Sequence, residues 1–234
     1  MALNATLSRS TQPAARDTGL LKEVWETVTY YSCPHHYNFH LHTTCSDGQL
    51  PPEALIEQAV SLGLKGMAIT DHHSTRGYQV AQKWLDNRRQ AAPTIPLPHL
   101  WTGVEITANL LDVDVHILGY GLDPQNLVMT PYLQGYRPQE QAARADCVIE
   151  ALHEAGALVV LAHPSRYRRP AAELIPVAAK LGIDGVEAYY AYGNPKPWEP
   201  SRDQTAEVLT LSQHYNLLTT CGTDTHGPNL LYRL

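Results

Sequence analysis

The chain has 234 residues, of which 44% are hydrophobic and 17% are charged, which is enough apolar material for one sizeable core. Its formal net charge of -6 provides no overall attraction to a polyanion and disfavours extended contact with long DNA or RNA. No segment approaches the roughly 18 apolar residues of a membrane span, and no apolar signal-peptide core opens the chain. We therefore expect a single catalytic-size domain in the cytoplasm, with no membrane partner.

The N-terminal part of the chain is expected to lie outside the main domain. Residues 1–17 are rich in Ser, Thr, Ala and Arg without hydrophobic periodicity, which predicts a disordered prefix. The segment LLKEVWETV at residues 20–28 predicts a short helix. We accordingly place an N-terminal extension at residues 1–37 and the main domain at residues 38–234.

From residue 38 onward, strand-like apolar runs alternate with amphipathic helical patterns, which is typical of an α/β fold. The predicted strands cover residues 38–42, 65–70, 100–107, 114–120, 157–163, 185–190 and 217–224. Helices are predicted at residues 52–62, 76–92, 138–155, 171–181 and 202–214, each with apolar residues three and four positions apart. Only a short segment separates the third and fourth strands, so we expect these two to form a hairpin.

Almost every predicted strand ends in a residue that can bind a metal. The two-residue spacing of His40 and His42 predicts that both imidazoles share one face of the first strand, opposite Phe39 and Leu41. The corresponding residues at the other strand ends are Asp71, His72, Glu105, His116, His163, Glu187, Asp224 and His226. Because the carboxyl ends of parallel barrel strands converge on one face, we expect these scattered residues to form one cluster.

Single residues of these types usually have simpler explanations. A lone histidine in an apolar strand is more often a packed core residue than a ligand, and a strand-end carboxylate is usually a helix cap. That interpretation suits His35, His36, His99, His153 and His214. It does not suit the strand-end set, because unrelated core histidines have no reason to recur beside carboxylates. Imidazole and carboxylate together suit Zn, Mn or Fe, and nine candidate ligands exceed the needs of one ion, so we predict a multinuclear site.

The four cysteines are not part of the predicted site. Cys33, Cys45, Cys147 and Cys221 lie far apart with no C-x-x-C pair, which argues against a zinc knuckle and a disulfide framework. A reducing compartment agrees with this pattern. Cys45 is interpreted as a small packed residue.

Six motifs carry a resemblance to a known family. HLHTTCSDG, AITDHH, GVE, DVHILGY, LAHP and GTDTHG occur in this order within residues 38–228. Together they resemble the PHP (polymerase and histidinol phosphatase) family of metal-dependent phosphoesterases. The resemblance implies a distorted seven-stranded (β/α)7 barrel similar to a TIM barrel, with two to three divalent ions, Mn, Fe or Zn, at a trinuclear site.

The resemblance also distributes nine ligands among three ions. One ion would be held by His40, His42, Glu105 and Asp224. Glu105 would bridge to a second ion completed by His116 and His163, and the third would be held by Asp47, His72 and His226. A metal-activated hydroxide would attack phosphorus in line, because paired ions lower the pKa of a bound water and stabilise charge on the attacking and leaving oxygens.

Three further residues are candidates for roles around the metals. Arg166, three positions past His163 in AHPSRY, is predicted to clamp the substrate phosphate, because a guanidinium binds phosphate with a planar fork. Asp71 is predicted to orient a ligand, since such supporting partners fix ligand geometry. Glu187 either supports the site or is a core acid paired with an arginine. No residue is identified as the general acid.

We expect the substrate to be a small phosphorylated molecule, such as a nucleotide or the end of a very short oligonucleotide. The helical insertion of the family's bisphosphate nucleotidases is missing between His116 and His163, so their exact substrate does not transfer. His73 stands where relatives frequently have Asp or Asn, which bears on substrate contacts. The oligomeric state is not indicated by the sequence.

Four alternatives stay open at this point. An amidohydrolase needs a bridging lysine at a later strand end, where this chain has Glu105 and His116. A histidinol-phosphate phosphatase belongs to the same family but generally has a longer chain. A non-catalytic metal-binding module would normally have lost ligands, whereas all nine positions are filled. A nuclease acting on long strands is disfavoured by the acidic balance and by the lack of a basic groove with interspersed aromatic residues.

Overall fold

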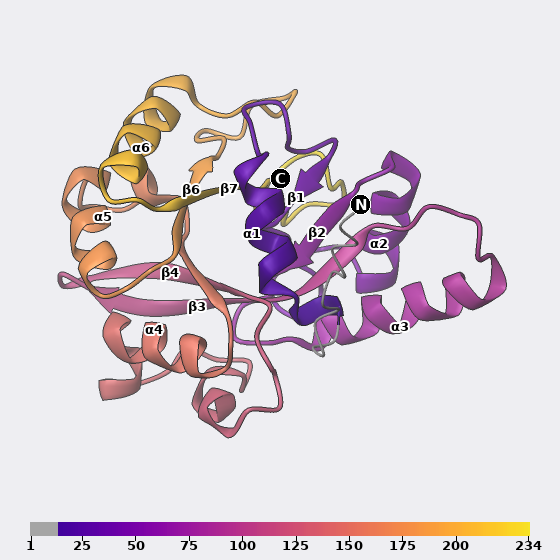
Figure 1. The fold of residues 1–234 in the computed structure, drawn as a ribbon, viewed down its shortest axis with the longest axis horizontal. Coiled ribbons are helices and arrows are strands. Elements are labelled where there is room, and N and C mark those ends of the chain that lie inside the picture. The colour runs from indigo at the N-terminus through magenta and orange to yellow at the C-terminus, as the bar shows by residue number, and fades with distance from the viewer. Residues whose placement is uncertain (1–13) are drawn as a thin grey trace, which may run out of the picture.

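Seven strands follow one another around a nearly closed barrel in the computed structural model, which describes residues 14–234 (Figure 1). They are β1 Tyr37–Asn38, β2 Gly66–Ile69, β3 His99–Leu110, β4 Val113–Tyr120, β5 Leu158–Leu161, β6 Gly185–Tyr189 and β7 Leu218–Cys221. Their spatial order equals their chain order. Strand β4 runs antiparallel to both β3 and β5, while all other neighbours are parallel. The predicted hairpin and the distorted seven-stranded α/β barrel are therefore confirmed.

A few backbone contacts join the segment after the first strand to the segment after the last strand. The N–H of Phe39 donates to the carbonyl of Cys221 at 3.0 Å, and the N–H of Asp224 donates to the carbonyl of His40 at 2.9 Å. A parallel bridge links Leu41 to Thr225. Residues 40–42 consequently lie beside residues 224–226, which places two ligand-bearing segments from opposite ends of the chain next to each other.

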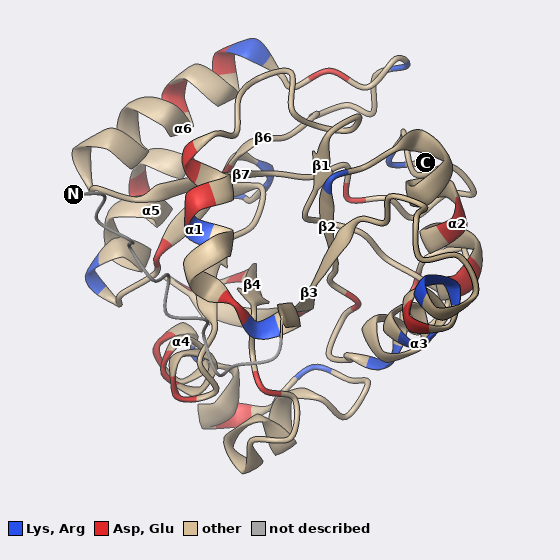
Figure 2. Ribbon diagram, turned by 45° about the vertical axis from the view of Figure 1, so that its right-hand side comes forward, with Lys and Arg blue, Asp and Glu red and all other residues tan. Residues whose placement is uncertain are grey.

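Six α-helices in residues 14–234 surround the strands. They are α1 Thr18–Glu26, α2 Pro52–Leu62, α3 Arg76–Ala91, α4 Ala145–Glu154, α5 Ala171–Lys180 and α6 Arg202–His214. Figure 2 looks into the ring of strands and shows α2 and α3 on one side and α4, α5 and α6 on the other. Among the helices of residues 14–234, none is both long and apolar enough to cross a bilayer.

One predicted helix, at residues 138–155, is substantially shorter in the structure. Glu140–Ala143 form a 3₁₀ turn, and the α-helix begins only at Ala145. Between them, Arg144 adopts an extended backbone with φ of -68° and ψ of 140°, and it forms a bridge with Asn109 of β3. An extended residue cannot continue a helix, so pairing with the strand edge overrides the helical periodicity of the segment.

The core consists of two hydrophobic clusters. The larger one includes Phe39, Trp25 and Tyr120, whereas Leu41 belongs to a smaller cluster with Leu55 and Ile56 of α2. Phe39 and Leu41 therefore pack in different clusters. The regular strand β1 ends at Asn38, two residues before His40.

The described part of the N-terminal extension packs into the larger cluster. Trp25 is 1% exposed, and its ring meets those of Tyr120 and Phe39 edge to face, with centroids 5.2 and 6.0 Å apart. Asp17 caps α1 by accepting the N–H of Leu20 at 2.9 Å. Residues 14–17 thus form a 3₁₀ turn and a helix cap, although the predicted disordered prefix included them. Residues 1–13 of that prediction lie outside the described residues.

Candidate metal centre

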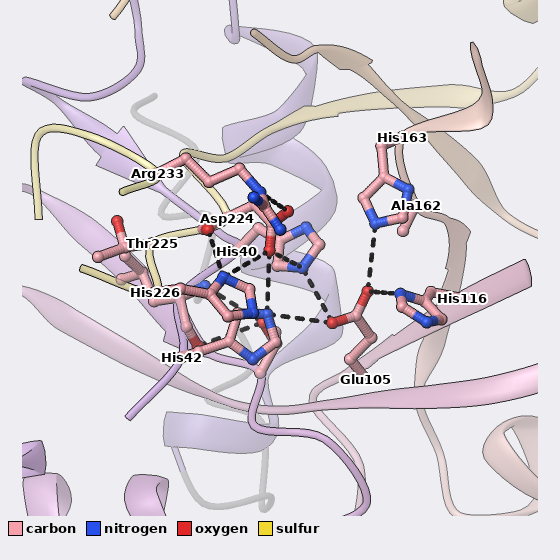
Figure 3. A network of polar contacts seen from close by, with 12 residues as sticks. His40, His42, Glu105, His116, Ala162, His163, Asp224, Thr225, His226 and Arg233 are labelled. Carbon is pink, nitrogen blue, oxygen red and sulfur yellow. Dashed lines mark hydrogen bonds and ion pairs between the residues drawn. The ribbon is translucent and has the colours of Figure 1, made fainter. Parts of the chain in front are cut away.

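The carboxylate of Glu105 lies at the centre of a cluster of histidines (Figure 3). Its Oε2 atom is 3.2 Å from Nε2 of His40 and 3.1 Å from Nε2 of His42. Its Oε1 atom is 2.8 Å from Nδ1 of His116 and 3.4 Å from Nε2 of His163. Oε2 is also 3.5 Å from Nδ1 of His72. The two oxygens of this buried side chain therefore face different sets of imidazoles, as in a carboxylate that bridges two ions.

Beside Glu105, a fully buried group of four donors forms the inner part of the site. It consists of His40, His42, Glu105 and Asp224, with ligand atoms within 4.8 Å of one another. Asp224 Oδ1 is 3.2 Å from Nε2 of His42 and 3.4 Å from Nε2 of His40. These four residues are the ones assigned to one ion from the sequence, and the structure brings them together.

Two further groups lie toward the rim. One contains His42, Asp47, His72 and His226, and the other contains His72, Glu105 and His116. Asp47 Oδ2 is 3.2 Å from Nε2 of His226 and 3.7 Å from Nε2 of His72. His163 belongs to neither group but reaches Glu105, so all nine predicted ligands converge. The three groups differ in two respects from the division among ions that the family resemblance implies. His42 belongs to two groups, and His72 also belongs to the group that contains His116.

Many polar atoms at the centre are buried without a hydrogen-bond partner. They include Nε2 of His40, both ring nitrogens of His42 and of His163, Nδ1 of His116 and both oxygens of Glu105. One such atom costs about 1–3 kcal/mol, so a concentration of them requires a compensating ligand. Cations placed among these lone pairs satisfy them together, and imidazole with carboxylate suits Zn, Mn or Fe. The residues present therefore fit a multinuclear metal centre.

Charge is distributed unevenly between the inner part and the rim. Burial lowers the pKa of His42, but Asp224 and Glu105 outweigh burial and raise this pKa to about 9. The pKa of His40 likewise lies well above its usual range, because Glu105, Glu187 and Asp224 outweigh the effect of burial. At the rim, burial and the neighbouring His42 and His116 lower the pKa of His72 to about 4. The inner carboxylates thus create the negative potential that attracts cations.

Comparison with known protein families identifies the family of this chain. The model of the PHP domain family matches residues 38–220. The chain belongs to the PHP domain family. This confirms the family predicted from the six motifs.

Three similar proteins are informative about this PHP domain. The 5′-3′ exoribonuclease Rnm of Escherichia coli is 34% identical over 51% of this chain and 38% of its own length. The 3′,5′-nucleoside bisphosphate phosphatase of Chromobacterium violaceum is 31% identical over 51% of this chain and 40% of its own length. The matches therefore span about two fifths of these curated relatives. A Bifidobacterium adolescentis structure described as a candidate metal-dependent phosphoesterase superimposes with a TM-score of 0.66 and 27% identity, covering 83% of this chain and 89% of that one.

Glu187 of β6 contacts two of the candidate ligands in this PHP domain. Its Oε1 atom lies 3.0 Å from Nδ1 of His40, and its Oε2 atom accepts the N–H of His163 at 2.9 Å. A carboxylate in this position fixes the tautomer and the orientation of the imidazole, so that Nε2 of His40 is directed at Glu105. The partners of Glu187 are thus two candidate ligands, His40 and His163, and among residues 14–234 no arginine forms an ion pair with it.

Asp71 is buried but contacts a loop rather than a ligand imidazole. It accepts the N–H of Thr43 at 2.7 Å, the hydroxyl of Thr43 at 2.8 Å and the hydroxyl of Ser46 at 2.8 Å. A Cβ atom at Gly77 would overlap its Oδ2, so the glycine makes room for this arrangement. Asp71 thus anchors residues 43–46, which lead directly to Asp47.

The second oxygen of Asp224 has partners that sequence reasoning missed. Its Oδ2 accepts the hydroxyl of Tyr190 at 2.7 Å, Nε of Arg233 at 2.7 Å and Nη1 of Arg166 at 3.0 Å. Only Arg166 was singled out from the sequence. Tyr190 ends an ordinary apolar strand and Arg233 lies in a short segment without a motif, so neither carried a recognisable signal.

The backbone is strained at two of the candidate ligands. His163 has φ of 27° and Asp224 has φ of 53°, which are left-handed conformations that residues with side chains rarely adopt. Each costs on the order of 1–3 kcal/mol, and such strain concentrates at functional sites where the surrounding structure maintains it. Gly222 allows the close approach of this segment to His40, because a Cβ atom there would overlap the Cβ of His40.

Proposed function

We propose that this PHP domain hydrolyses a small phosphorylated substrate, a nucleotide or the end of a very short oligonucleotide, at a trinuclear metal centre. The proposal is supported by the position of Glu105, whose Oε2 faces His40, His42 and His72 while its Oε1 faces His116 and His163. A further group of donors lies at the rim. The ions are assigned as follows: His40, His42, Glu105 and Asp224 for the first; Glu105, His116 and His163 for the second; Asp47, His72 and His226 for the third.

The residues of the chain divide the work of such a reaction. Divalent ions at this centre supply Lewis acidity, which lowers the pKa of a water and offsets charge on the phosphate oxygens. The side chain of Arg166 is 42% exposed at the edge of the centre and is the candidate for orienting the phosphate with its fork. Asp71 fixes the loop that presents Asp47, and Glu187 fixes the ring of His40. Together these contacts hold the donors in place before substrate binds.

The surroundings of Arg166 support a substrate of limited size. A recess of about 510 Å³ lies beside it and is lined by Asp112, Val113, Asp114, Arg166, Tyr167 and Arg168. This volume lies within the roughly 300–1,000 Å³ range of small-molecule sites. None of the nine candidate ligands lines the recess, so it would hold a part of the substrate that extends past Arg166 and away from the metals. Figure 2 shows Lys and Arg interspersed with Asp and Glu on the helices around the barrel, which does not favour tracking of a long phosphate backbone.

The similar proteins favour a second candidate function, the removal of nucleotides from the 5′ end of RNA. The Escherichia coli and Haemophilus influenzae relatives are both named 5′-3′ exoribonucleases, at 34% and 32% identity. The same metal centre would serve either reaction, since both cleave a phosphate ester. Substrate length therefore distinguishes the two candidates.

The test is a substrate panel with manganese-loaded protein. The panel contains p-nitrophenyl phosphate, mononucleotides, nucleoside bisphosphates and 5′-phosphorylated RNA of 2 to about 20 nucleotides. We expect hydrolysis of the smallest substrates, and loss of it after chelation and in Glu105→Gln. Absence of hydrolysis across the panel contradicts the function, faster turnover of the longer RNAs favours the exonuclease, and fewer than two ions per chain in elemental analysis contradicts the trinuclear centre.

A further inference from the structure

Two guanidinium groups converge on the outer oxygen of Asp224. Arg166 contacts Oδ2 from the 3₁₀ turn Pro164–Arg166, and Arg233 contacts it from the C-terminal turn at residues 227–234, as Figure 3 shows for Arg233. The inner oxygen, Oδ1, faces His40 and His42 instead. Asp224 therefore separates the two arginines from the inner metal group.

One carboxylate does not neutralise this pair. Among residues 14–234, no second carboxylate forms an ion pair with either arginine, so the two guanidiniums and Asp224 leave one positive charge in excess. Arg166 donates to Asp224 through Nη1, and Arg233 donates through Nε. The other N–H groups of both guanidiniums do not bond to this carboxylate. Guanidinium forks match the geometry of a phosphate group.

The two arginines line the same small recess. Its walls are Arg166, Tyr190, Ala191, Tyr192, Gly193, Asn194 and Arg233, and its volume is about 150 Å³. The lining contains guanidinium, phenol and amide groups but no carboxylate. A volume below the usual range for whole ligands indicates that the recess accommodates one group of a substrate rather than an entire nucleoside.

We propose that Arg233 is a substrate-binding residue and that, with Arg166, it forms a subsite for a phosphate group in this recess. The C-terminal turn is then part of the substrate site as well as a closing element of the barrel. The identification of the anion as a substrate phosphate rests on the proposed function, whereas the binding of a phosphate anion by the two arginines does not.

The turn that carries Arg233 is anchored by groups other than the arginine side chain. The carbonyl of Arg233 accepts the N–H groups of His226 and Gly227, and the Thr225 hydroxyl donates to the carbonyl of Tyr232 at 2.9 Å. Leu230 is fully buried. A change of the Arg233 side chain therefore leaves these anchors in place, so that its effect on binding can be measured in a folded protein.

The test measures the binding of inorganic phosphate to metal-free protein by calorimetry, for wild type, Arg233→Ala and Arg233→Lys. Arg88→Ala, on the exposed surface of α3, is the matched control. We expect the dissociation constant to rise at least about tenfold in Arg233→Ala and less in Arg233→Lys, which keeps the charge but loses the fork, with no change in the control.

Metal content and kinetics separate binding from a purely structural role. With manganese loaded, Arg233→Ala is expected to keep its ions, and its kcat/KM for phosphomonoesters is expected to fall mainly through a rise in KM. Unchanged phosphate affinity in Arg233→Ala, or no phosphate binding by the wild type, overturns the proposal, as does loss of metal without a change in phosphate affinity. One outcome separates the two proposals. If manganese-loaded wild type hydrolyses no substrate, but metal-free wild type still binds phosphate more tightly than metal-free Arg233→Ala, the proposed function fails and the anion subsite stands.

Discussion

The carboxylate of Glu187 lies 3.0 Å from Nδ1 of His40, on the opposite edge of the imidazole from Glu105. This contact determines which ring nitrogen is available to a cation. We predict that Glu187→Gln lowers the affinity for the inner metal ion about tenfold to a hundredfold, the usual effect of removing such a partner. Metal titration monitored by elemental analysis measures it. Glu207→Gln, on the exposed side of α6, is the control, and equal affinities of the two variants would contradict the supporting role.

Removal of metal should destabilise the fold, because the donors come from segments next to six of the seven strands. When the free metal concentration is about 100 times the dissociation constant of a site, binding stabilises the folded state by about 2.7 kcal/mol. For a chain of this size, each kcal/mol shifts Tm by roughly 2–4 °C. We therefore expect chelation to lower Tm by roughly 5–10 °C per occupied site, and manganese to restore it. A Glu105→Gln variant should show a smaller shift, and an unchanged Tm in the wild type after complete chelation would argue against bound metal in the native fold.

Metal binding should also release protons at neutral pH. The pKa of His42 is raised to about 9 in the metal-free protein, above the ordinary 6.5, so this group stabilises the metal-free fold most below pH 6.5 and loses that contribution as pH rises through 9. A metal ion requires the neutral imidazole and must displace the proton. Metal affinity is therefore expected to increase with pH from 6.5 to 9. Calorimetry at pH 7.5 in buffers of different ionisation enthalpy measures the release, and an enthalpy independent of buffer would contradict it.

The convergence of the ligands was predictable from the sequence because it depends on topology. Residues that follow short parallel strands meet at one end of a barrel, so His72 and His163 could be grouped without knowledge of any distance. Glu105 reaches the same end from within the longer strand β3. Helices with clear periodicity were also predictable, and α2 and α6 span the predicted residues. The family resemblance added the division among ions, which periodicity alone does not contain.

Other contacts depend on tertiary details that no local pattern expresses. The pairing of Arg233 with Asp224 follows from the C-terminal turn and from the contacts between residues 40–42 and 224–226. The late start of the helix predicted at residues 138–155, which begins only at Ala145, follows from the bridge between Arg144 and Asn109 of β3. Asp71 adjoins a ligand in the sequence, yet its side chain is turned toward Thr43 by the glycine at position 77 and by three donors.

This orientation of Asp71 gives a selective prediction. Asp71→Ala removes the acceptor of three hydrogen bonds from Thr43 and Ser46 and should release the loop that presents Asp47. We expect the rim ion to be lost while the ions held at Glu105 remain, so that the metal content falls by about one ion per chain. Elemental analysis after dialysis measures this, with Asp86→Ala on α3 as the control. Loss of all ions together, or of none, would show that the loop does not act separately.

The N-terminal extension packs onto the barrel through Trp25. Trp25 is 1% exposed and packs edge to face against Tyr120, whose hydroxyl donates to the carbonyl of Phe39 at 2.9 Å. The indole thus covers a contact between β4 and the segment that leads to His40. Trp25→Ala should lower the free energy of unfolding by about 3–5 kcal/mol, the usual cost of deleting a buried aromatic ring.

Chemical denaturation of the metal-free protein measures this change. The matched control is Tyr31→Ala in the same extension, whose side chain is 80% exposed and whose removal should change the free energy of unfolding by less than about 0.5 kcal/mol. Because the ring of Trp25 also touches Phe39, the residue before His40, the Trp25→Ala variant should bind the inner ion more weakly. Equal stability of the two variants would mean that the extension folds independently of the barrel, and the boundary at residues 37 and 38 would then separate two units.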